Sequence, residues 1–261
     1  MPHPLADTAA QWLFDQHASR ATFNGVQPSP PQPDESFAYD VQDGLVARRQ
    51  LVRPQQTGGY KIGLTTPRMQ ALCHGDRPIS GVVFADDIRP APAQLEAQRY
   101  VRLGLESELA VRIGRPVRQP GGAVSRDDVA ACVDGIAAAF ELIEDRGADY
   151  QTLNWLWLAA DNSWNAGLVL AAAVKPRDVS NLKGTLYIDG AEADTGSTRD
   201  VLGHPYDAVA WLENHLRARG RSLEAGQWVS TGSIANIQFA RPGRHYRFEI
   251  EGLPAVEVSV A

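Results

Sequence analysis

Residues 101–113 read VRLGLESELAVRI, a stretch in which apolar and polar side chains alternate. Successive side chains of a β-strand point to opposite faces of a sheet, so this alternation predicts a strand with one apolar face. The same period places Glu106 and Glu108 together on the other face. The apolar positions that define the buried face are Val101, Leu103, Leu105, Leu109, Val111 and Ile113.

The neighbouring carboxylates Glu106 and Glu108 need an explanation, because like charges so close together repel each other unless a cation lies between them. One interpretation is therefore a metal site. The alternative is a solvated face of an antiparallel strand, where exposed carboxylates are common. The pair alone does not decide between these two interpretations.

A third carboxylate, Glu141, stands in the stretch AAFELIEDR (138–146), which otherwise resembles a buried strand. A buried carboxylate must be paired with a cation or bind a metal. Three carboxylates with open coordination positions suit a hard ion such as Mg²⁺ or Mn²⁺. The alternative for Glu141 is a structural ion pair with Arg146 or another arginine, and both possibilities stay open from these residues.

Two further motifs offer polar side chains at strand ends. In GGYKIGLT (58–65), Lys61 lies between apolar residues, and the glycines allow close backbone approach. A surface lysine whose ammonium reaches water is the competing interpretation. In VVFADD (82–87), Asp86 follows an apolar run, where most acidic residues only begin a turn.

The segments ADNSWNAG (160–167) and STGS (230–233) are predicted loops at strand ends. Both are rich in groups that can hold the oxygen atoms of a ligand, although ordinary turns have a similar composition.

The remaining pattern predicts many strands and few helices. Helices are expected over residues 6–20, 41–52 and 205–219, and a further helix begins at Ser125, where Asp128 completes a capping box. Val209, Leu212 and Leu216 form an apolar stripe on the helix that Gly220 ends. Besides residues 101–113, strands are predicted over residues 60–64, 82–84, 167–171, 184–188, 228–231, 246–250 and 256–260.

Composition limits the classes of function. The 261 residues carry a formal charge of −6 with no run of Lys or Arg, so nucleic acid is not an expected partner. The sequence has neither an apolar stretch long enough to span a membrane nor a signal-like N-terminus, and we expect a cytoplasmic protein with no membrane partner. Cys73 and Cys132 lack metal-ligand spacing and are expected to be core thiols.

The order and spacing of seven motifs resemble the 2-keto-4-pentenoate hydratase family of the fumarylacetoacetate hydrolase superfamily. In chain order the motifs are GYKIGLT, VVFADD, LESELAV, AFELIEDR, ADNSWNAG, GHPYDAVAWL and STGS. The resemblance implies an α+β fold, a mixed β-roll core with peripheral helices. We expect one compact domain overall, in which a helical segment of residues 1–57 packs on a catalytic core of residues 58–261.

The resemblance also implies roles for individual residues. It assigns a divalent metal, Mg²⁺ or Mn²⁺, to Glu106, Glu108 and Glu141. It places Lys61 and Asp86 at the substrate as acid, base or polar clamp. Three residues are expected to bind substrate, and these are Trp164, Thr231 and Ser233.

Trp164 departs from the family pattern, because many members carry serine at the matching position. A large indole there is expected to alter the size of substrate that the pocket accepts. The alternative is an aromatic side chain of the core or of a subunit interface. A homo-oligomer is the expected assembly.

The activity implied by the resemblance is hydration of a substrate like 2-hydroxypenta-2,4-dienoate to a 4-hydroxy-2-oxo acid, through a metal-stabilised enolate. Three alternatives remain. They are a decarboxylase of the 4-oxalocrotonate type, an acylpyruvate C–C hydrolase, and a non-catalytic protein that binds a 2-oxo acid or acts as a scaffold. We rank the hydrolase last of the enzymes, because no histidine lies in an obvious lid beside a glutamate.

Overall fold

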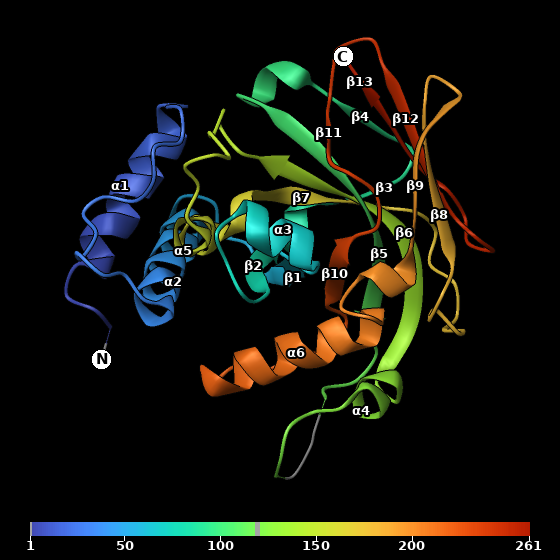
Figure 1. Cartoon of the computed structure of the whole chain (residues 1–261), viewed down its shortest axis with the longest axis horizontal. Helices are drawn as coiled ribbons and strands as arrows, with labels where there is room; N and C mark the ends of the chain where they lie inside the picture. The colour runs from blue at the N-terminus through green and yellow to red at the C-terminus, as the bar shows by residue number, and fades with distance from the viewer. Residues whose placement is uncertain (1, 118–120) are drawn as a thin grey trace.

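An eight-stranded mixed sheet forms the centre of the computed structural model, which describes residues 2–117 and 121–261 (Figure 1). Seven strands follow the order β2-β1-β10-β5-β6-β7-β3, and β11 also pairs with β5. The pairs β1–β10 and β3–β7 are parallel, and the others are antiparallel. The strands are β1 (Thr57–Gly63), β2 (Ile79–Phe84), β3 (Ile88–Pro90), β5 (Leu103–Ile113), β6 (Val133–Glu144), β7 (Asn165–Leu170), β10 (Trp228–Ser233) and β11 (Gln238–Phe239).

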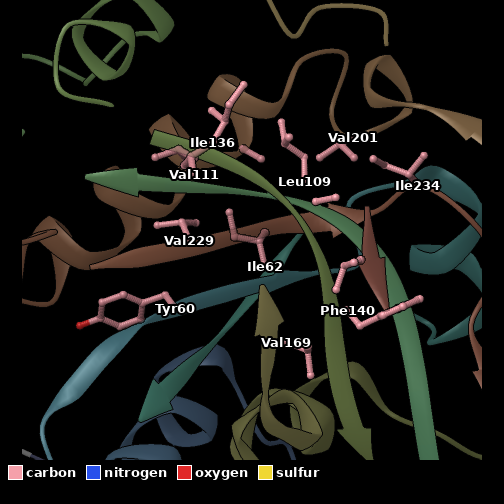
Figure 2. Close-up of a cluster of buried hydrophobic side chains, with 14 of the residues drawn as sticks. Tyr60, Ile62, Leu109, Val111, Ile136, Phe140, Val169, Val201, Val229 and Ile234 are labelled. Carbon is pink, nitrogen blue, oxygen red and sulfur yellow. The ribbon is translucent and has the colours of Figure 1, made fainter. Parts of the chain in front are cut away.

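A second sheet of five strands, in the order β4-β13-β12-β8-β9, covers one part of the first sheet and lies at the right in Figure 1. The rings of Phe140 on β6 and Phe248 on β12 meet between the sheets, with 6.2 Å between their centroids. Figure 2 shows part of the core that surrounds Phe140. The strands are β4 (Ala93–Leu95), β8 (Lys183–Ile188), β9 (Ala191–Ser197), β12 (His245–Ile250) and β13 (Val256–Val260).

Helices lie at the periphery of the sheets. The apolar stripe of α6 joins the main core, and Gly220, with φ of +73°, ends the helix by donating its N–H to the carbonyl of Arg217. The capping box of Ser125 and Asp128 is present at the start of α4. The helices are α1 (Ala6–Ala18), α2 (Glu35–Val52), α3 (Pro67–Leu72), α4 (Arg126–Ala130), α5 (Trp155–Ala160) and α6 (Pro205–Ala218).

Helix α2 packs on both α1 and α5 at the left of Figure 1, where the three helices share a second apolar cluster. This cluster also includes Leu64, Ile79 and Ile143, which belong to the region of the large sheet. The division of the chain at residue 58 stays a prediction. No helix of the described residues is long and apolar enough to cross a membrane.

The predicted fold class is confirmed as a mixed β core with peripheral helices. All eight predicted strands are present, with ends that differ by a few residues. The short helices α3 and α5 and the strand β9 were not predicted, because each is too short or too polar to show a clear period. Cys73 and Cys132 are buried and free, as expected of core thiols.

The contact between the two sheets gives a prediction about stability. Phe248→Ala should lower the free energy of unfolding by about 3–5 kcal/mol, because it leaves a cavity beside Phe140. The matched control is Leu51→Ala, which removes an 82% exposed side chain and should change stability by less than about 0.5 kcal/mol. Urea unfolding of both variants measures the difference, and equal losses would contradict the packing described.

Candidate metal centre

Three glutamates converge where β5 and β6 pair. Glu106 lies directly opposite Glu141 in the ladder, and Glu108 follows two residues along β5 on the same face. One carboxylate oxygen from each residue lies within 4.8 Å of the others. The side chains of Glu108 and Glu141 are fully buried, whereas Glu106 is half-buried. The strand register therefore brings Glu141 next to Glu108 and Glu106, which precede it by 33 and 35 positions in the sequence.

Each buried glutamate has one oxygen held by the protein and one oxygen free. Oε2 of Glu108 accepts hydrogen bonds from the Ser230 hydroxyl at 2.6 Å and from the Gly232 N–H at 2.8 Å. Oε1 of Glu141 accepts one from the Asn165 amide at 2.9 Å. Within the described residues, Glu108 Oε1 and Glu141 Oε2 have no hydrogen-bond partner. Unpaired buried acceptors of this kind are costly unless a ligand uses them.

The electrostatics of the cluster favour a cation. Burial, together with the neighbouring carboxylates, raises the pKa of Glu108 well above its usual range. Burial also raises the pKa of Glu141 to about 7, against the opposing effect of Lys61. Carboxylate oxygens are the ligands that Mg²⁺ and Mn²⁺ prefer. The unpaired oxygens and this donor set fit a hard divalent cation held by Glu106, Glu108 and Glu141.

Lys61 lies on β1 beside the glutamates. Its Nζ is 3.3 Å from Oε1 of Glu141 and donates a hydrogen bond to the Ser163 hydroxyl at 3.1 Å. Burial lowers the pKa of Lys61, but the nearby glutamates more than offset this and raise it overall. The side chain is therefore a buried ammonium, and the surface interpretation of this lysine is wrong.

Glu141 forms its ion pair with a lysine and not with Arg146. Arg146 pairs with the buried Asp161 at 3.0 Å and contacts His17. Glu141 instead faces Lys61, which uses Oε1 and leaves Oε2 open. The ion pair and a metal ligand role are therefore compatible.

Two of the expected site residues are not brought to this cluster. Asp86 belongs to a short 3₁₀ turn after β2, where it is exposed and lies 3.4 Å from the Arg53 guanidinium. Thr231 is fully buried and donates its hydroxyl hydrogen to the Leu109 carbonyl at 2.8 Å. Side chains alternate along β10, so Thr231 points away from the face that Ser230 uses. Neither residue lines the cavity beside Glu106.

A cavity adjoins the glutamates and is lined in part by Lys61, Glu106 and Ser233. Trp164 forms part of its wall, but is only 4% exposed and also belongs to the apolar cluster of the N-terminal helices. Its ring packs edge-on against Phe23 and Tyr150. Trp164 thus combines the two roles that the sequence left as alternatives, a pocket wall and a core aromatic.

Sequence reasoning missed the residues that orient the cluster. Ser230 and Asn165 hold the two buried glutamates, and Ser163 accepts a hydrogen bond from Lys61. Each belongs to a motif quoted for the resemblance, but the sequence gives no signal for which hydroxyl or amide points inward. The pairing of Lys61 with Ser230 in the β1–β10 ladder supplies that information.

Residues 73–261 match the family described as "Fumarylacetoacetate (FAA) hydrolase C-terminal". The chain belongs to this family. The match contains Glu106, Glu108 and Glu141, and it begins after β1, the strand that carries Lys61.

Relatives within the family are similar over nearly the whole chain. A 2-oxo-hept-4-ene-1,7-dioate hydratase from Escherichia coli is 29% identical over 255 residues, 95% of this chain and 94% of the relative. A 4-oxalocrotonate decarboxylase from a Pseudomonas species is 28% identical and covers 85% of each chain. The structure of 4-oxalocrotonate decarboxylase from Pseudomonas putida G7, complexed with magnesium and adipate, has a TM-score of 0.89 and 24% identity, and it covers 98% of this chain and 97% of its own.

The geometry of the cluster predicts which substitutions abolish metal binding. Glu106→Gln, Glu108→Gln and Glu141→Gln should each reduce Mg²⁺ or Mn²⁺ binding below detection by titration calorimetry, because each removes an anionic ligand. Glu192→Gln, on the exposed part of β9, is the matched control and should bind as the unchanged protein does. Unchanged binding in any of the three variants would show that its glutamate is not a ligand.

The raised pKa of Glu141, about 7, gives a pH prediction. Without metal, the folded carboxyl holds its proton more tightly than the unfolded one, so the metal-free protein should lose stability as pH rises from about 4.5 to 7. Below pH 7 the cation must displace that proton. Mg²⁺ should therefore raise the melting temperature more at pH 8 than at pH 6, and an equal rise at both values would contradict this electrostatic description.

Proposed function

We propose that this protein is a divalent-metal-dependent lyase that adds water to a 2-hydroxy-2,4-dienoic acid and gives a 4-hydroxy-2-oxo acid. The observation that carries the proposal is the cluster of Glu106, Glu108 and Glu141 beside the buried ammonium of Lys61, in which the two buried glutamates each keep an unpaired oxygen. Relatives that are similar over most of the chain bear hydratase names, which supports this reaction class.

A 2-oxo or 2-hydroxy acid presents two adjacent oxygen donors, its carboxylate and its 2-oxygen. A cation bound by the three glutamates would draw electron density from the 2-oxygen and so stabilise the enolate form of the substrate. Glu106 is the ligand that also lines the cavity, so the cavity is the route by which such a substrate reaches the site.

Lys61 is the candidate proton donor. Ketonisation of the dienol requires a proton on carbon, and the Lys61 ammonium lines the cavity close to Glu106 and Glu141. Ser163 accepts its hydrogen bond and so fixes the direction of Nζ. Asp86 and Thr231 are left out of this proposal, because one lies on the surface and the other in the sheet interior.

A decarboxylase is the second candidate, favoured by the 28% identical 4-oxalocrotonate decarboxylase and by the similar fold of its Pseudomonas putida G7 counterpart. Loss of carbon dioxide from an unsaturated 2-oxo acid passes through the same kind of enolate, so the glutamate cluster serves either reaction. Product analysis separates them, because only decarboxylation releases carbon dioxide. The homo-oligomer and the cytoplasmic location stay predictions.

Removing the Lys61 ammonium tests the proposed reaction. Lys61→Met should lower kcat about 10²–10⁴-fold, the range typical of a lost acid–base group, while Mg²⁺ binding is retained because no ligand is removed. Lys183→Met, at an exposed position on β8, is the matched control and should keep full activity. Turnover is followed by the loss of dienol absorbance, and Mg²⁺ binding by calorimetry.

Two results would count against the role of Lys61. If Lys61→Met turns over substrate about as fast as the control variant, Lys61 is not the proton donor and serves only as a structural ion pair with Glu141. Absence of magnesium-dependent turnover in the unchanged protein, with dienoic acids and with 4-oxalocrotonate, would support the non-catalytic alternative.

A further inference from the structure

The inner part of the cavity beside Glu106 is mainly apolar. Lys61, Glu106, Ser163 and Ser233 contribute polar groups on the side of the metal centre, and Thr65, Thr66 and Tyr150 also belong to the lining. The rest of the wall is built largely from side chains that offer no charge and little hydrogen bonding. They are Leu64, Met69, Ile143, Leu158, Trp164 and Ile237.

No cation of the described lining is available for a second anionic group in this inner part. Lys61 is the cation there, and its charge is balanced by Glu141, whose Oε1 lies 3.3 Å from Nζ at the metal-centre end of the cavity. The Tyr150 hydroxyl donates its hydrogen to Asp145, so it is not free to hold a carboxylate. A second carboxylate would therefore lose its water without gaining a cationic partner.

The outer part of the cavity is no better suited to an anion. It shares Met69, Glu106 and Ile237 with the inner part and adds one cation, Arg68. Asp194 and Asp200 line the same mouth, and Asp194 interacts electrostatically with Arg68. The formal charges added at the mouth are thus one positive and two negative. A substrate whose tail extends outward meets a net negative environment.

These observations deepen the proposed function, on which this inference rests. We propose that the substrate carries a single carboxylate, which lies at the metal centre, and an uncharged hydrocarbon tail, which occupies the inner cavity between Leu158, Ile143 and Met69. Substrates with a carboxylate at both ends are selected against. The 2-oxo-hept-4-ene-1,7-dioate hydratase and the 4-oxalocrotonate decarboxylase are, by their names, enzymes of such two-ended acids, so this chain differs from them in its preference.

Saturated 2-oxo acids test the tail site without any reaction. In the presence of Mg²⁺, calorimetry compares 2-oxopentanoate, 2-oxohexanoate and 2-oxohexanedioate. Affinity should rise about threefold to fourfold for the added methylene of 2-oxohexanoate, as for burial of a CH₂ group. Relative to 2-oxohexanoate, affinity should fall at least about tenfold for 2-oxohexanedioate, because its second carboxylate finds no cation in the cavity. Equal or tighter binding of the diacid overturns the proposal.

Substitutions at Met69 and Arg68 locate the effect in the cavity. Met69 is half-buried and lines both parts, so Met69→Arg places a cation where the tail lies, whereas Met69→Leu is the matched uncharged control. The Arg variant should improve 2-oxohexanedioate binding relative to 2-oxohexanoate, and the Leu variant should not. Arg68→Met should leave the ratio of 2-oxohexanedioate affinity to 2-oxohexanoate affinity unchanged. A selective loss of diacid binding in Arg68→Met would show that Arg68 holds a second carboxylate and would overturn the proposal.

Turnover assays distinguish failure of this inference from failure of the proposed function. If dienoic diacids are hydrated faster than alkyl-substituted monoacids, the tail assignment is wrong and the hydratase proposal stands. If no dienoic acid is hydrated but the binding order holds, the tail assignment stands and the hydratase proposal is wrong. Release of carbon dioxide from 4-oxalocrotonate at a comparable kcat/KM would overturn both.

Discussion

The mutual repulsion of three glutamates is the constraint on which the rest of the site depends. Glu106, Glu108 and Glu141 place carboxylate oxygens within 4.8 Å of one another, and two of these side chains are fully buried. Burial without compensation is costly for even one carboxylate. The raised pKa values of Glu108 and Glu141 express that cost as a preference for the protonated form. A divalent cation bound between the three glutamates would relieve this cost and use the oxygens that the protein leaves unpaired.

The arrangement of strands explains how this unfavourable cluster is held in place. Four adjacent strands of the large sheet contribute, since β1 carries Lys61, β10 carries Ser230, and β5 and β6 carry the glutamates. The backbone of Gly232 lies so close to Thr65 that a Cβ atom at position 232 would be 2.4 Å from the Thr65 hydroxyl oxygen, so only glycine fits there. The Gly232 N–H donates a hydrogen bond to Glu108. Hydrogen bonds fix one oxygen of each buried glutamate, so a cation bound here would meet carboxylates that are already oriented.

Much of the fold and part of the site could be predicted from the sequence. Strand period alone places Glu106 and Glu108 on one face, and the apolar run around Glu141 indicates burial. The pairing of Glu106 with Glu141 needs the register of β5 and β6, which no local pattern contains. The same limit explains why Thr231 was expected to bind substrate although it lies in the sheet interior: the sequence does not reveal which residues of STGS face the cluster. Asp86 was expected at the substrate, but the chain turns outward after β2.

The most direct test of the metal centre is the anomalous diffraction of crystals grown with Mn²⁺. One strong anomalous peak per chain is expected between Glu106, Glu108 and Glu141, about 2.0–2.3 Å from an oxygen of each, as in other hard-cation sites. A peak elsewhere, or a manganese ion that contacts only one of these glutamates, would contradict the three-glutamate metal centre.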